Sequence, residues 1–366
     1  MAPQAQGKGQ SKPGWNRRDF LCMTAGAAIA LLVPGCRRIP SSPSAPIPTG
    51  WINAERYKKS LPWQIGRSGR GDVNAWMVMF SAHIEYGIME KYREHFKEYF
   101  CTSANWDPNK QIEDIKILLA EGVDLLLIDP MDTTVVAAGV QEAMDTGVPV
   151  ILASTRVSGA PYVSWVTSNE EERGSACGDW LCRTITGGRV AVLVSVPAAG
   201  ESELWLKGVR RRLGDRPDIE MIVEQCPWSS AGAKQVMASM LSEFTPIDAV
   251  IVQNGVLGRG VVQAFTEHSN EIPPIAGADD WNGWLRTARE YGVRFMGLSG
   301  GANLGLRAVD LAAEVLSGQQ VPRYVEFPYK TFDDSVLDRY YYPDLSDHYW
   351  AIHDLPAAWI ERMFRP

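Results

Sequence analysis

Short apolar runs alternate with amphipathic stretches along most of this chain, and the alternation limits the fold more than any other feature of the sequence. In the first half of the chain, apolar runs of strand length occur at 75–80, 125–128, 148–153 and 162–166. Stretches with helical spacing lie between them, at 85–97, 109–120 and 133–146. This order is typical of a parallel sheet covered by helices.

A second series of the same kind follows. Its expected strands are 190–194, 221–223, 249–252, 275–278 and 295–298, and its expected helices are 201–212, 231–243, 256–267, 281–290 and 302–316. The repetition predicts an α/β protein with two similar lobes, each an open parallel sheet flanked by helices. Open parallel sheets bind ligands at the carboxyl ends of their strands, so two hinged lobes would enclose a cleft between those ends.

The N-terminal sequence NRRDFLCMTAGAAIALLVPGC indicates export. Its apolar part, residues 20–33, has 14 residues, whereas a membrane-spanning helix needs roughly 20. The pair Arg17 and Arg18, followed by Phe20, resembles a twin-arginine export signal, and small residues fill the apolar part. Residues 1–35 are therefore expected to be a signal peptide.

The end of this segment, LVPGC, resembles a lipobox, in which Cys36 would be lipidated and become the new N-terminus. Pro34 stands where such motifs usually have a small residue. The Pro- and Ser-rich stretch that follows is typical of a flexible tether, so 36–72 is expected to be a tether and N-terminal segment.

Charge and motif content exclude several classes of protein. Without residues 1–35 the chain loses four positive charges and one negative, so its formal net charge moves from −7 to −10. Nucleic acid is therefore not an expected partner, because affinity for phosphate backbones comes from Lys and Arg. No Gly-x-x-x-x-Gly-Lys-Ser/Thr loop and no zinc spacing of Cys and His is present, so we expect no enzyme, no cofactor and no metal.

Four segments of the chain resemble one family. VDLLLIDPMDTTVVAAGVQEAMDTGVPVILAS is similar to a strand–helix–strand segment, and VIVQNGVLGRGVVQAF to a strand, an asparagine turn and a helix. IAGADDW is similar to a strand that ends in aspartate, and FMGLSGGANLGLRAVDLAAEVLSGQQVP to a hinge strand and final helix. In this order they resemble the type I periplasmic sugar-binding proteins, the ribose- and galactose-binding group of ABC-transporter solute receptors.

The resemblance implies a two-lobed fold with three hinge crossings, near Thr167, Ser299 and Tyr329. Lobe 1 would comprise 74–166 and 300–327, and lobe 2 would comprise 167–299 and 330–344. Residues 345–366 continue past the usual end of the family as an aromatic C-terminal extension. We expect this extension to pack over one lobe; the alternative is that it reaches the cleft.

The resemblance also implies a set of ligand-binding residues at strand ends and the starts of helices. These are Ser81, His83, Tyr86 and Arg156 from lobe 1, and Glu201, Trp205, Asn254, Asp279 and Ser299 from lobe 2. Thr155, Trp205 and Ser299 stand where many relatives have Asp, Arg, and Gln or Asn, which predicts a changed specificity. Sugars do need carboxylate, amide and guanidinium partners together with an aromatic face.

Each of these residues also has a structural interpretation that the sequence leaves open. Asp279, for example, could cap the helix that begins at Trp281. Trp281 and Trp284 are expected in the core rather than on a sugar. Ser81 and His83 with a distant Asp could in principle form a catalytic triad, but nothing in the sequence fixes their geometry.

The expected function is the substrate-binding component of an ABC-type sugar transporter, which binds a monosaccharide or related polyol in the cleft between the lobes. The expected partners are an ABC transporter permease and the membrane, through the lipid anchor, and the protein is expected to be a monomer in the periplasm or on the outer face of the cell membrane. The alternative is the ligand-binding component of a membrane sensor for a cyclitol, nucleoside or amino sugar. A regulator of the lac-repressor type would need a basic helix-turn-helix where this chain has its export signal.

Overall fold

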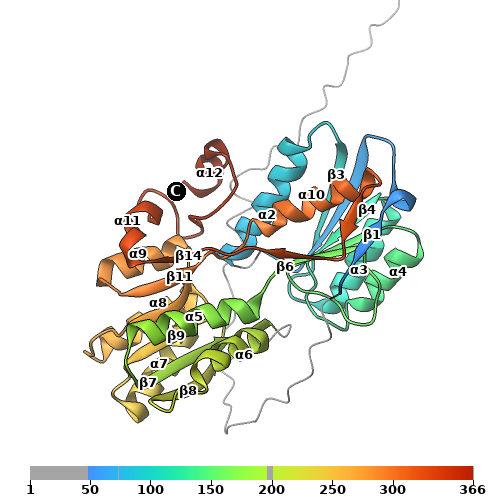
Figure 1. The fold of residues 1–366 in the computed structure, drawn as a ribbon. Coiled ribbons are helices and arrows are strands. Elements are labelled where there is room, and N and C mark those ends of the chain that lie inside the picture. The colour runs from blue at the N-terminus through green and yellow to red at the C-terminus, as the bar shows by residue number, and fades with distance from the viewer. Residues whose placement is uncertain (1–47, 73, 196–200, 366) are drawn as a thin grey trace, which may run out of the picture. The chain divides into compact units, whose positions relative to one another are not determined.

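Two six-stranded sheets organise the part of the chain that the structure, a computed structural model, describes: residues 48–72, 74–195 and 201–365 (Figure 1). All of these residues belong to one compact unit of the chain. A short antiparallel pair, β1 (Trp51–Asn53) with β12 (Gln320–Pro322), adds a third sheet of two strands. The expected signal peptide, 1–35, and the expected lipidation site, Cys36, lie outside the described residues.

The first sheet is wholly parallel and has the strand order β3-β2-β4-β5-β6-β13. Its strands β4 and β5 are buried on both faces, as expected for a sheet covered by helices on both sides. The strands are β2 (Trp63–Gly69), β3 (Phe96–Ser103), β4 (Leu125–Ile128), β5 (Val150–Ala153), β6 (Ser164–Ser168) and β13 (Tyr324–Phe327).

Alternate residues of β4 enter two different cores, which shows how the helices cover this sheet. Leu125 and Leu127 pack in a cluster with residues of α2 and α10, whereas Leu126 and Ile128 pack with residues of α3 and α4. The helices are α2 (Ala75–Tyr86), α3 (Pro108–Ala120), α4 (Ala137–Asp145) and α10 (Leu304–Leu316).

The second sheet has the order β8-β7-β9-β10-β11-β14, parallel except for β14. Helices α5 and α6 cover one face, and α7, α8 and α9 cover the other. The strands are β7 (Gly188–Ser195), β8 (Ile219–Cys226), β9 (Ala249–Val252), β10 (Ile275–Asp279), β11 (Phe295–Leu298) and β14 (Thr331–Asp333). The helices are α5 (Glu170–Thr184), α6 (Glu201–Leu213), α7 (Ser230–Phe244), α8 (Gly255–Glu267) and α9 (Asn282–Tyr291).

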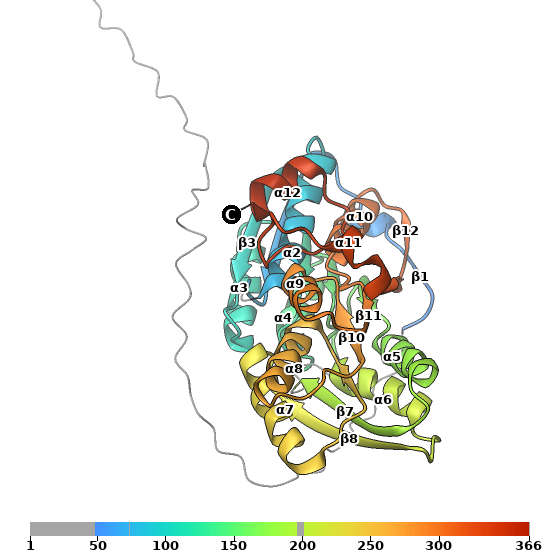
Figure 2. The ribbon, with the colours of Figure 1, turned by 90° about the vertical axis from the view of Figure 1, so that its left-hand side faces the viewer.

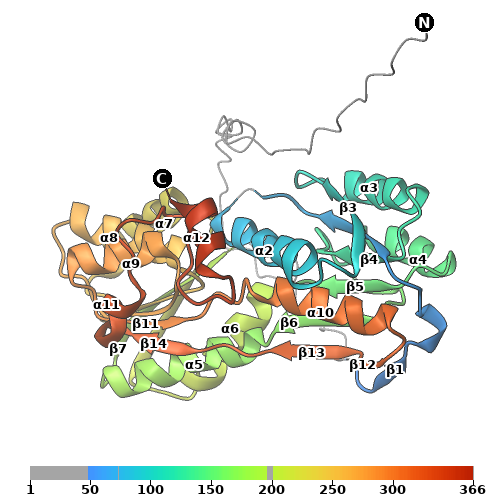
Figure 3. The ribbon, with the colours of Figure 1, turned by 90° about the horizontal axis from the view of Figure 1, so that it is seen from above.

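The chain crosses between the sheets three times, which confirms the predicted two-lobed fold with three hinge crossings. Strand β6 of the first sheet is followed by α5 on the second, and β11 of the second is followed by α10 on the first. The third crossing joins β13 to β14; Figure 3 shows these two strands following one another from one sheet into the other. The first crossing begins at Asn169, just after the predicted Thr167, which still pairs with Glu326 inside the sheet.

The secondary structure predicted for 75–97 was wrong. Residues 75–80, expected as a strand, begin helix α2, and 85–97, expected as a helix, end α2, form a π-helical turn (Gly87–Lys91) and enter β3. Eight consecutive residues of α2, from Met77 to Ile84, are buried, so the helix has no polar face to give it a helical period. The side chain of Asn74 caps this helix and accepts a hydrogen bond from Met77 N at 3.0 Å.

The true first strand, β2, lies in 36–72, which was expected to be a tether and N-terminal segment and in which no strand was predicted. Its sequence, WQIGRSG, has two glycines and a buried arginine, so it lacks the apolar run of its neighbours. A side chain at Gly66 would come within 2.8 Å of Leu126 Cδ2, which explains the glycine. Arg67 in this strand is buried, and its Nη2 donates to Ser81 Oγ on α2 at 2.7 Å.

The C-terminal segment after β14 was expected to pack over one lobe, and the structure shows a different arrangement. Helix α11 (Leu337–Tyr340) contacts α9 of lobe 2, whereas on α12 (Ala357–Phe364) the ring of Trp359 packs edge-on against Tyr86 of α2, in lobe 1. Figure 2 shows α12 beside α2 and α11 beside α9. The segment therefore contacts both lobes.

Candidate functional site

An arginine-centred network connects three strand ends of the first sheet. Arg70, directly after β2, donates to both carboxylate oxygens of Asp129, directly after β4; the bond from Nε measures 2.9 Å. Its Nη2 also donates to Thr155 Oγ1, after β5, at 3.0 Å. All three side chains are buried, so the guanidinium charge is balanced locally and the group holds the Thr155 hydroxyl in one orientation.

Glu201 brings lobe 2 into this network. It is the first residue of α6, and its Oε1 accepts hydrogen bonds from Thr155 Oγ1 at 2.8 Å and from Ser154 Oγ at 3.3 Å. Thr155 and Ser154 follow β5 in lobe 1. The carboxyl edges of the two sheets are therefore in direct hydrogen-bond contact.

Arg156 lies beside this contact with an aromatic neighbour. Its guanidinium carbon is 5.4 Å from the centre of the Trp165 ring. Trp165 Nε1 donates to the carbonyl of Ser154 at 2.9 Å, which fixes the ring. Arg156 and Trp165 thus combine a cation and an aromatic face at the edge of lobe 1.

Backbone strain is concentrated at the same edge. Among the described residues other than glycine, a positive φ occurs at Asn105, Trp106, Ser154 and Ser269. The first three follow β3 or β5, at the carboxyl edge of the first sheet. Strained residues of this kind cluster at functional sites, because the surrounding structure must hold them in place.

The second sheet contributes two adjacent acids at the end of β10. Asp279 Oδ1 accepts from Trp281 N at 3.3 Å, and Asp280 accepts from Gly300 N at 2.6 Å. Burial raises the pKa of Asp279 to about 7, and the neighbouring Asp280 adds to this effect. Burial also raises the pKa of Asp280 to about 6, although its backbone N–H donors oppose the shift.

Asn254 begins α8 next to these acids. Its Oδ1 accepts a hydrogen bond from Leu257 N at 3.0 Å and so caps the helix. The space is narrow here, because a Cβ on Gly255 would lie 2.6 Å from Asp279 Oδ1. The helix for which the sequence left a capping role open for Asp279 is α9, where Asp279 Oδ1 accepts from Trp281 N although the cap residue is Trp281 itself.

Ser299 belongs to the hinge. Its Oγ accepts from Lys330 N at 2.9 Å, and its carbonyl accepts from Arg173 Nη1 at 2.7 Å. The Arg173 guanidinium carbon also lies 5.8 Å from the Tyr329 ring centre. Arg173, in the first turn of α5, thus connects all three crossings. Its ion-pair partner is Glu170, and burial raises the pKa of this carboxyl group to about 7.

Three of the expected site residues lie inside α2 rather than in the turn after the first strand. Ser81 accepts from Arg67 and donates to Asp72 Oδ1 at 2.5 Å, and His83 is fully buried with its Nδ1 2.8 Å from the Met79 carbonyl. Tyr86 packs against Trp359. The turn that actually follows the first strand contains Arg70 and Asp72.

Trp205 is also placed differently from the stacking face that was expected. It is 1% exposed and packs with Leu181 and Val192 in the core beneath α5 and α6. The structure therefore brings Arg156, Glu201, Asn254, Asp279 and Ser299 to the carboxyl edges and the hinge, but places Ser81, His83, Tyr86 and Trp205 within packed helices. As predicted, Trp281 and Trp284 are buried.

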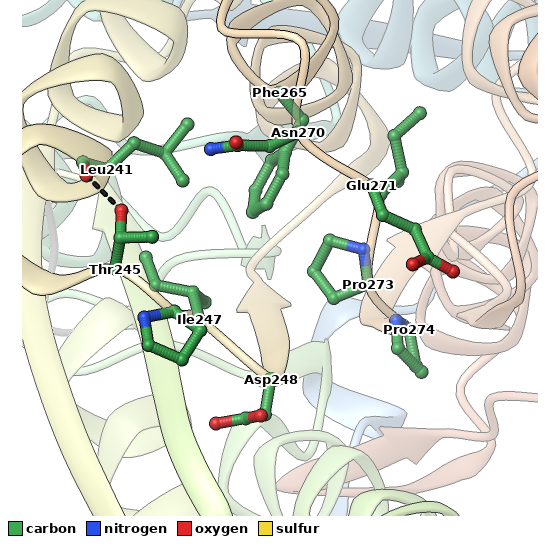
Figure 4. Close-up of a pocket in the computed structure, with 11 residues that line it drawn as sticks. Leu241, Thr245, Ile247, Asp248, Phe265, Asn270, Glu271, Pro273 and Pro274 are labelled. Atoms are coloured by element: carbon green, nitrogen blue, oxygen red, sulfur yellow. Dashed lines mark hydrogen bonds between the residues drawn. The ribbon is translucent and has the colours of Figure 1, made fainter.

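A surface pocket of about 380 Å³ lies at the opposite edge of the second sheet (Figure 4). Its lining includes Asp248, which precedes β9, and Pro274, which precedes β10. These are the amino ends of the strands, whereas ligands of open parallel sheets bind at the carboxyl ends. The pocket is therefore separate from the network described above.

Comparison with known proteins identifies the family. A model described as "periplasmic binding protein domain" matches residues 74–320. This chain belongs to that family.

Two relatives of this periplasmic binding protein have stated ligands. It is 23% identical to the ribose import binding protein of Bacillus subtilis over 77% of this chain and 91% of the relative. It is 26% identical to a xylitol-binding protein of Mycolicibacterium smegmatis over 50% of this chain, and there it spans about half of the relative (53%).

A solved structure supports the fold of the periplasmic binding protein. The crystal structure of a Mycobacterium smegmatis protein in complex with β-D-fucofuranose superposes with a TM-score of 0.67 at 23% identity. The match covers 76% of this chain and 93% of the solved one. The two-lobed α/β arrangement is thus shared across most of both chains.

Sequence reasoning about this family member missed Arg70 and Asp129. The signal for Asp129 was present, because an acid directly after the apolar run LLLI marks the carboxyl end of a buried strand. Arg70 was hidden because strand β2 itself was not predicted. Arg70 and Asp129 form an ion pair, and each can be buried because the other balances its charge. A prediction of one residue therefore depends on a prediction of the other.

Among residues 48–72, 74–195 and 201–365, no group of three or more His, Cys, Asp or Glu side chains is placed to hold a metal ion. None of the helices in the described ranges is long and apolar enough to cross a membrane.

Proposed function

We propose that this chain is the substrate-binding component of an ABC-type sugar transporter and that it binds a monosaccharide or related polyol between its lobes. The observation that carries the proposal is the hydrogen bond from Thr155 of lobe 1 to Glu201 of lobe 2, because it joins the carboxyl edges at which such sheets bind ligands. The names of the ribose import and xylitol-binding relatives favour a small polyhydroxylated ligand.

The proposed ligand contacts are Arg156, Glu201, Asn254, Asp279 and Ser299. Carboxylate, amide, hydroxyl and guanidinium groups can each bond one or two sugar hydroxyls, and Trp165 beside Arg156 offers an apolar ring face. Thr155 is joined to Arg70 and Glu201, so a ligand hydroxyl that enters here competes with the contact between the lobes. Ligand contacts would then replace the direct contact and favour a closed form that a permease recognises.

A cationic ligand, such as an amino sugar or amino cyclitol, is a second candidate. Glu201 accepts from two hydroxyl groups, and Asp279 and Asp280 accept from backbone N–H groups, so three carboxyl groups meet neutral donors at the lobe 2 edge. Arg70 on the opposite edge is already paired with Asp129. A ligand ammonium group would be attracted by Glu201, and it would favour the charged forms of Asp279 and Asp280, whose pKa values are raised by burial.

We also propose how the protein is exported and how it is attached to the membrane. Residues 1–35 would direct twin-arginine export, and a lipid on Cys36 would hold a monomeric protein at the outer face of the membrane next to its permease. A membrane sensor could use the same cleft, since both partners would read lobe closure. We propose no catalytic activity.

A thermal-shift screen of the purified protein tests the ligand class directly. The panel contains pentoses, hexoses, polyols, cyclitols, amino sugars and nucleosides, and a ligand of the native state adds about 2.7 kcal/mol of stability at a hundred times its Kd. Asp279→Asn and Arg156→Ala should abolish a true cleft hit, whereas Glu113→Ala on the exposed side of α3 should leave it unchanged. Sugar-class hits support the first candidate, amino-compound hits the second, and a panel without any hit contradicts both.

A further inference from the structure

Residues 342–347 of the C-terminal segment are bound to lobe 2. Asn282 Nδ2, in the first turn of α9, donates to the carbonyls of Tyr342 at 2.9 Å and Leu345 at 3.0 Å. Asp347 forms ion pairs with Arg259 of α8 and Arg286 of α9, at 3.1 Å each. These contacts place residues 342–347 on the helices that cover the second sheet.

The same segment then reaches the hinge at Asp280. The Oδ2 of this buried carboxylate accepts from Ile352 N at 2.6 Å, its carbonyl accepts from Ala351 N at 3.0 Å, and its Oδ1 accepts from Gly300 N in the second crossing. The ring of Trp350 lies against Gly300, where an added Cβ would be only 2.0 Å from a ring carbon. One carboxylate therefore connects the C-terminal segment to the second crossing.

Only two residues later, the segment is bound to lobe 1. Asp354 N donates to His83 Nε2 on α2 at 3.2 Å, and Asn303 Nδ2, at the start of α10, donates to Asp354 Oδ2 at 2.6 Å. Burial lowers the pKa of His83 to about 4, so its ring is neutral at pH 7 and Nε2 can accept a hydrogen bond. Trp359 on α12 extends the attachment by packing on Tyr86.

This arrangement limits how far the two attachment points can separate. Ile352 is bound to Asp280 of lobe 2 and Asp354 to His83 of lobe 1, and two residues of extended chain span at most about 7 Å. A rotation of the lobes that moves Asp280 away from His83 must therefore break one of these bonds. In addition, Trp350 and Trp359 belong to one apolar cluster with residues of both lobes, so separation would also expose apolar surface.

We propose that residues 345–365 form a fourth connection between the lobes, a strap that restrains their opening in the ligand-free protein. The three hinge crossings permit rotation, and the strap opposes it through the bonds of Ile352 to Asp280 and of Asp354 to His83 and Asn303. This role goes beyond ligand binding. It depends on the two-lobed fold and needs no particular ligand.

The test compares the full chain with a chain that ends at His353, in the absence of ligand. This truncation keeps the attachment to Asp280 but removes Asp354 and α12, and a chain that ends at Phe364 is the matched control. We expect the shorter chain to have a larger radius of gyration by small-angle X-ray scattering. By hydrogen exchange, peptides that cover Ser154 to Arg156 and the second crossing should exchange about fivefold faster or more, since each lost hydrogen bond is worth roughly that factor.

A peptide covering β8, at the outer edge of the second sheet, serves as the internal reference and should not change. Asn303→Ala with Asp354→Ala removes one hydrogen bond without deleting chain, so it decides the question if the truncated chain fails to fold; about fivefold faster exchange at the cleft is expected. Unchanged exchange and radius in a folded truncation, or unchanged cleft exchange in the double variant, would overturn the proposal and leave the segment a local cover for α2.

Discussion

The carboxyl group of Asp279 is held in conditions that favour its neutral form. Burial raises its pKa to about 7 in the folded protein, from an ordinary value near 3.8. The native state therefore holds this proton more tightly than the unfolded chain does. The stability that the group contributes is fully present below about pH 4 and is lost as the pH rises through 7.

Asp279→Asn removes this titration and keeps an oxygen that can accept from Trp281 N. We therefore expect the free energy of unfolding of the variant, relative to the unchanged protein, to increase between pH 5 and pH 8. One unit of pKa shift corresponds to about 1.4 kcal/mol, so the change should reach at least that size. Urea unfolding at the two pH values measures it, and a difference that does not vary with pH would contradict the shifted pKa.

Arg70 and Asp129 are a second test at the scale of residues. Arg70→Met leaves a buried carboxylate without its cation, so we expect a loss of about 3 kcal/mol in the free energy of unfolding. In the double variant Arg70→Met, Asp129→Leu no charge is left unpaired, and part of the loss should be recovered. Urea unfolding of both variants decides the question; equal stability of the two would argue against a coupled pair.

Two substitutions of Asn254, the N-cap residue of α8, distinguish its role in capping the helix from a role in ligand binding. Asn254→Ala removes the acceptor for Leu257 N and should lower stability by about 1 kcal/mol. Asn254→Ser keeps a capping oxygen but shortens the side chain and removes its amide donors. If Asn254 also binds ligand, the serine variant should unfold like the unchanged protein by thermal denaturation and yet bind the thermal-shift hit more weakly. Unchanged affinity in the serine variant would restrict Asn254 to its capping role.

Strands were predictable where both of their faces are buried. The runs at 125–128, 249–252 and 295–298 coincide with β4, β9 and β11, because such strands are almost continuously apolar. The same rule failed at 75–80, since helix α2 is buried on all sides and its sequence is equally continuous. A continuous apolar sequence indicates that a segment is buried. It distinguishes a strand from a helix only when one face of the element is polar, because the pattern then has a period.

The site was predictable only in part, for a related reason. Arg156, Glu201, Asn254 and Asp279 follow elements whose bounds were nearly right, so they were placed at the correct edge. Ser81, His83 and Tyr86 were placed with respect to a strand that does not exist there. The pairing of Arg70 with Asp129 joins residues 59 positions apart, and no local pattern encodes such a contact.

At the scale of the whole molecule, the cellular location of the protein tests the lipid anchor that we propose at Cys36. If this residue carries a lipid, Cys36→Ser should move the exported protein from the membrane fraction to the soluble fraction while the thermal-shift hit is unchanged. Arg17→Lys with Arg18→Lys is the matched test of the export route and should retain the precursor inside the cell. Immunoblotting of cell fractions measures both, and a serine variant that stays in the membrane fraction would contradict the anchor.

In the sequence, the main part of lobe 2 is inserted between two parts of lobe 1, and this order affects how the protein can fold during its synthesis. The sheet of lobe 1 begins with β2, but its helix α10 and last strand β13 come only after the chain has passed through β7 to β11 of lobe 2. During translation, the first five strands of lobe 1 are therefore made before α10, and the sheet face that α10 covers stays partly exposed until most of the second sheet has been synthesised. Ile352 and Asp354, which bond to Asp280 of lobe 2 and His83 of lobe 1, follow every strand of both sheets in the chain, so these two contacts form only after both sheets have been synthesised.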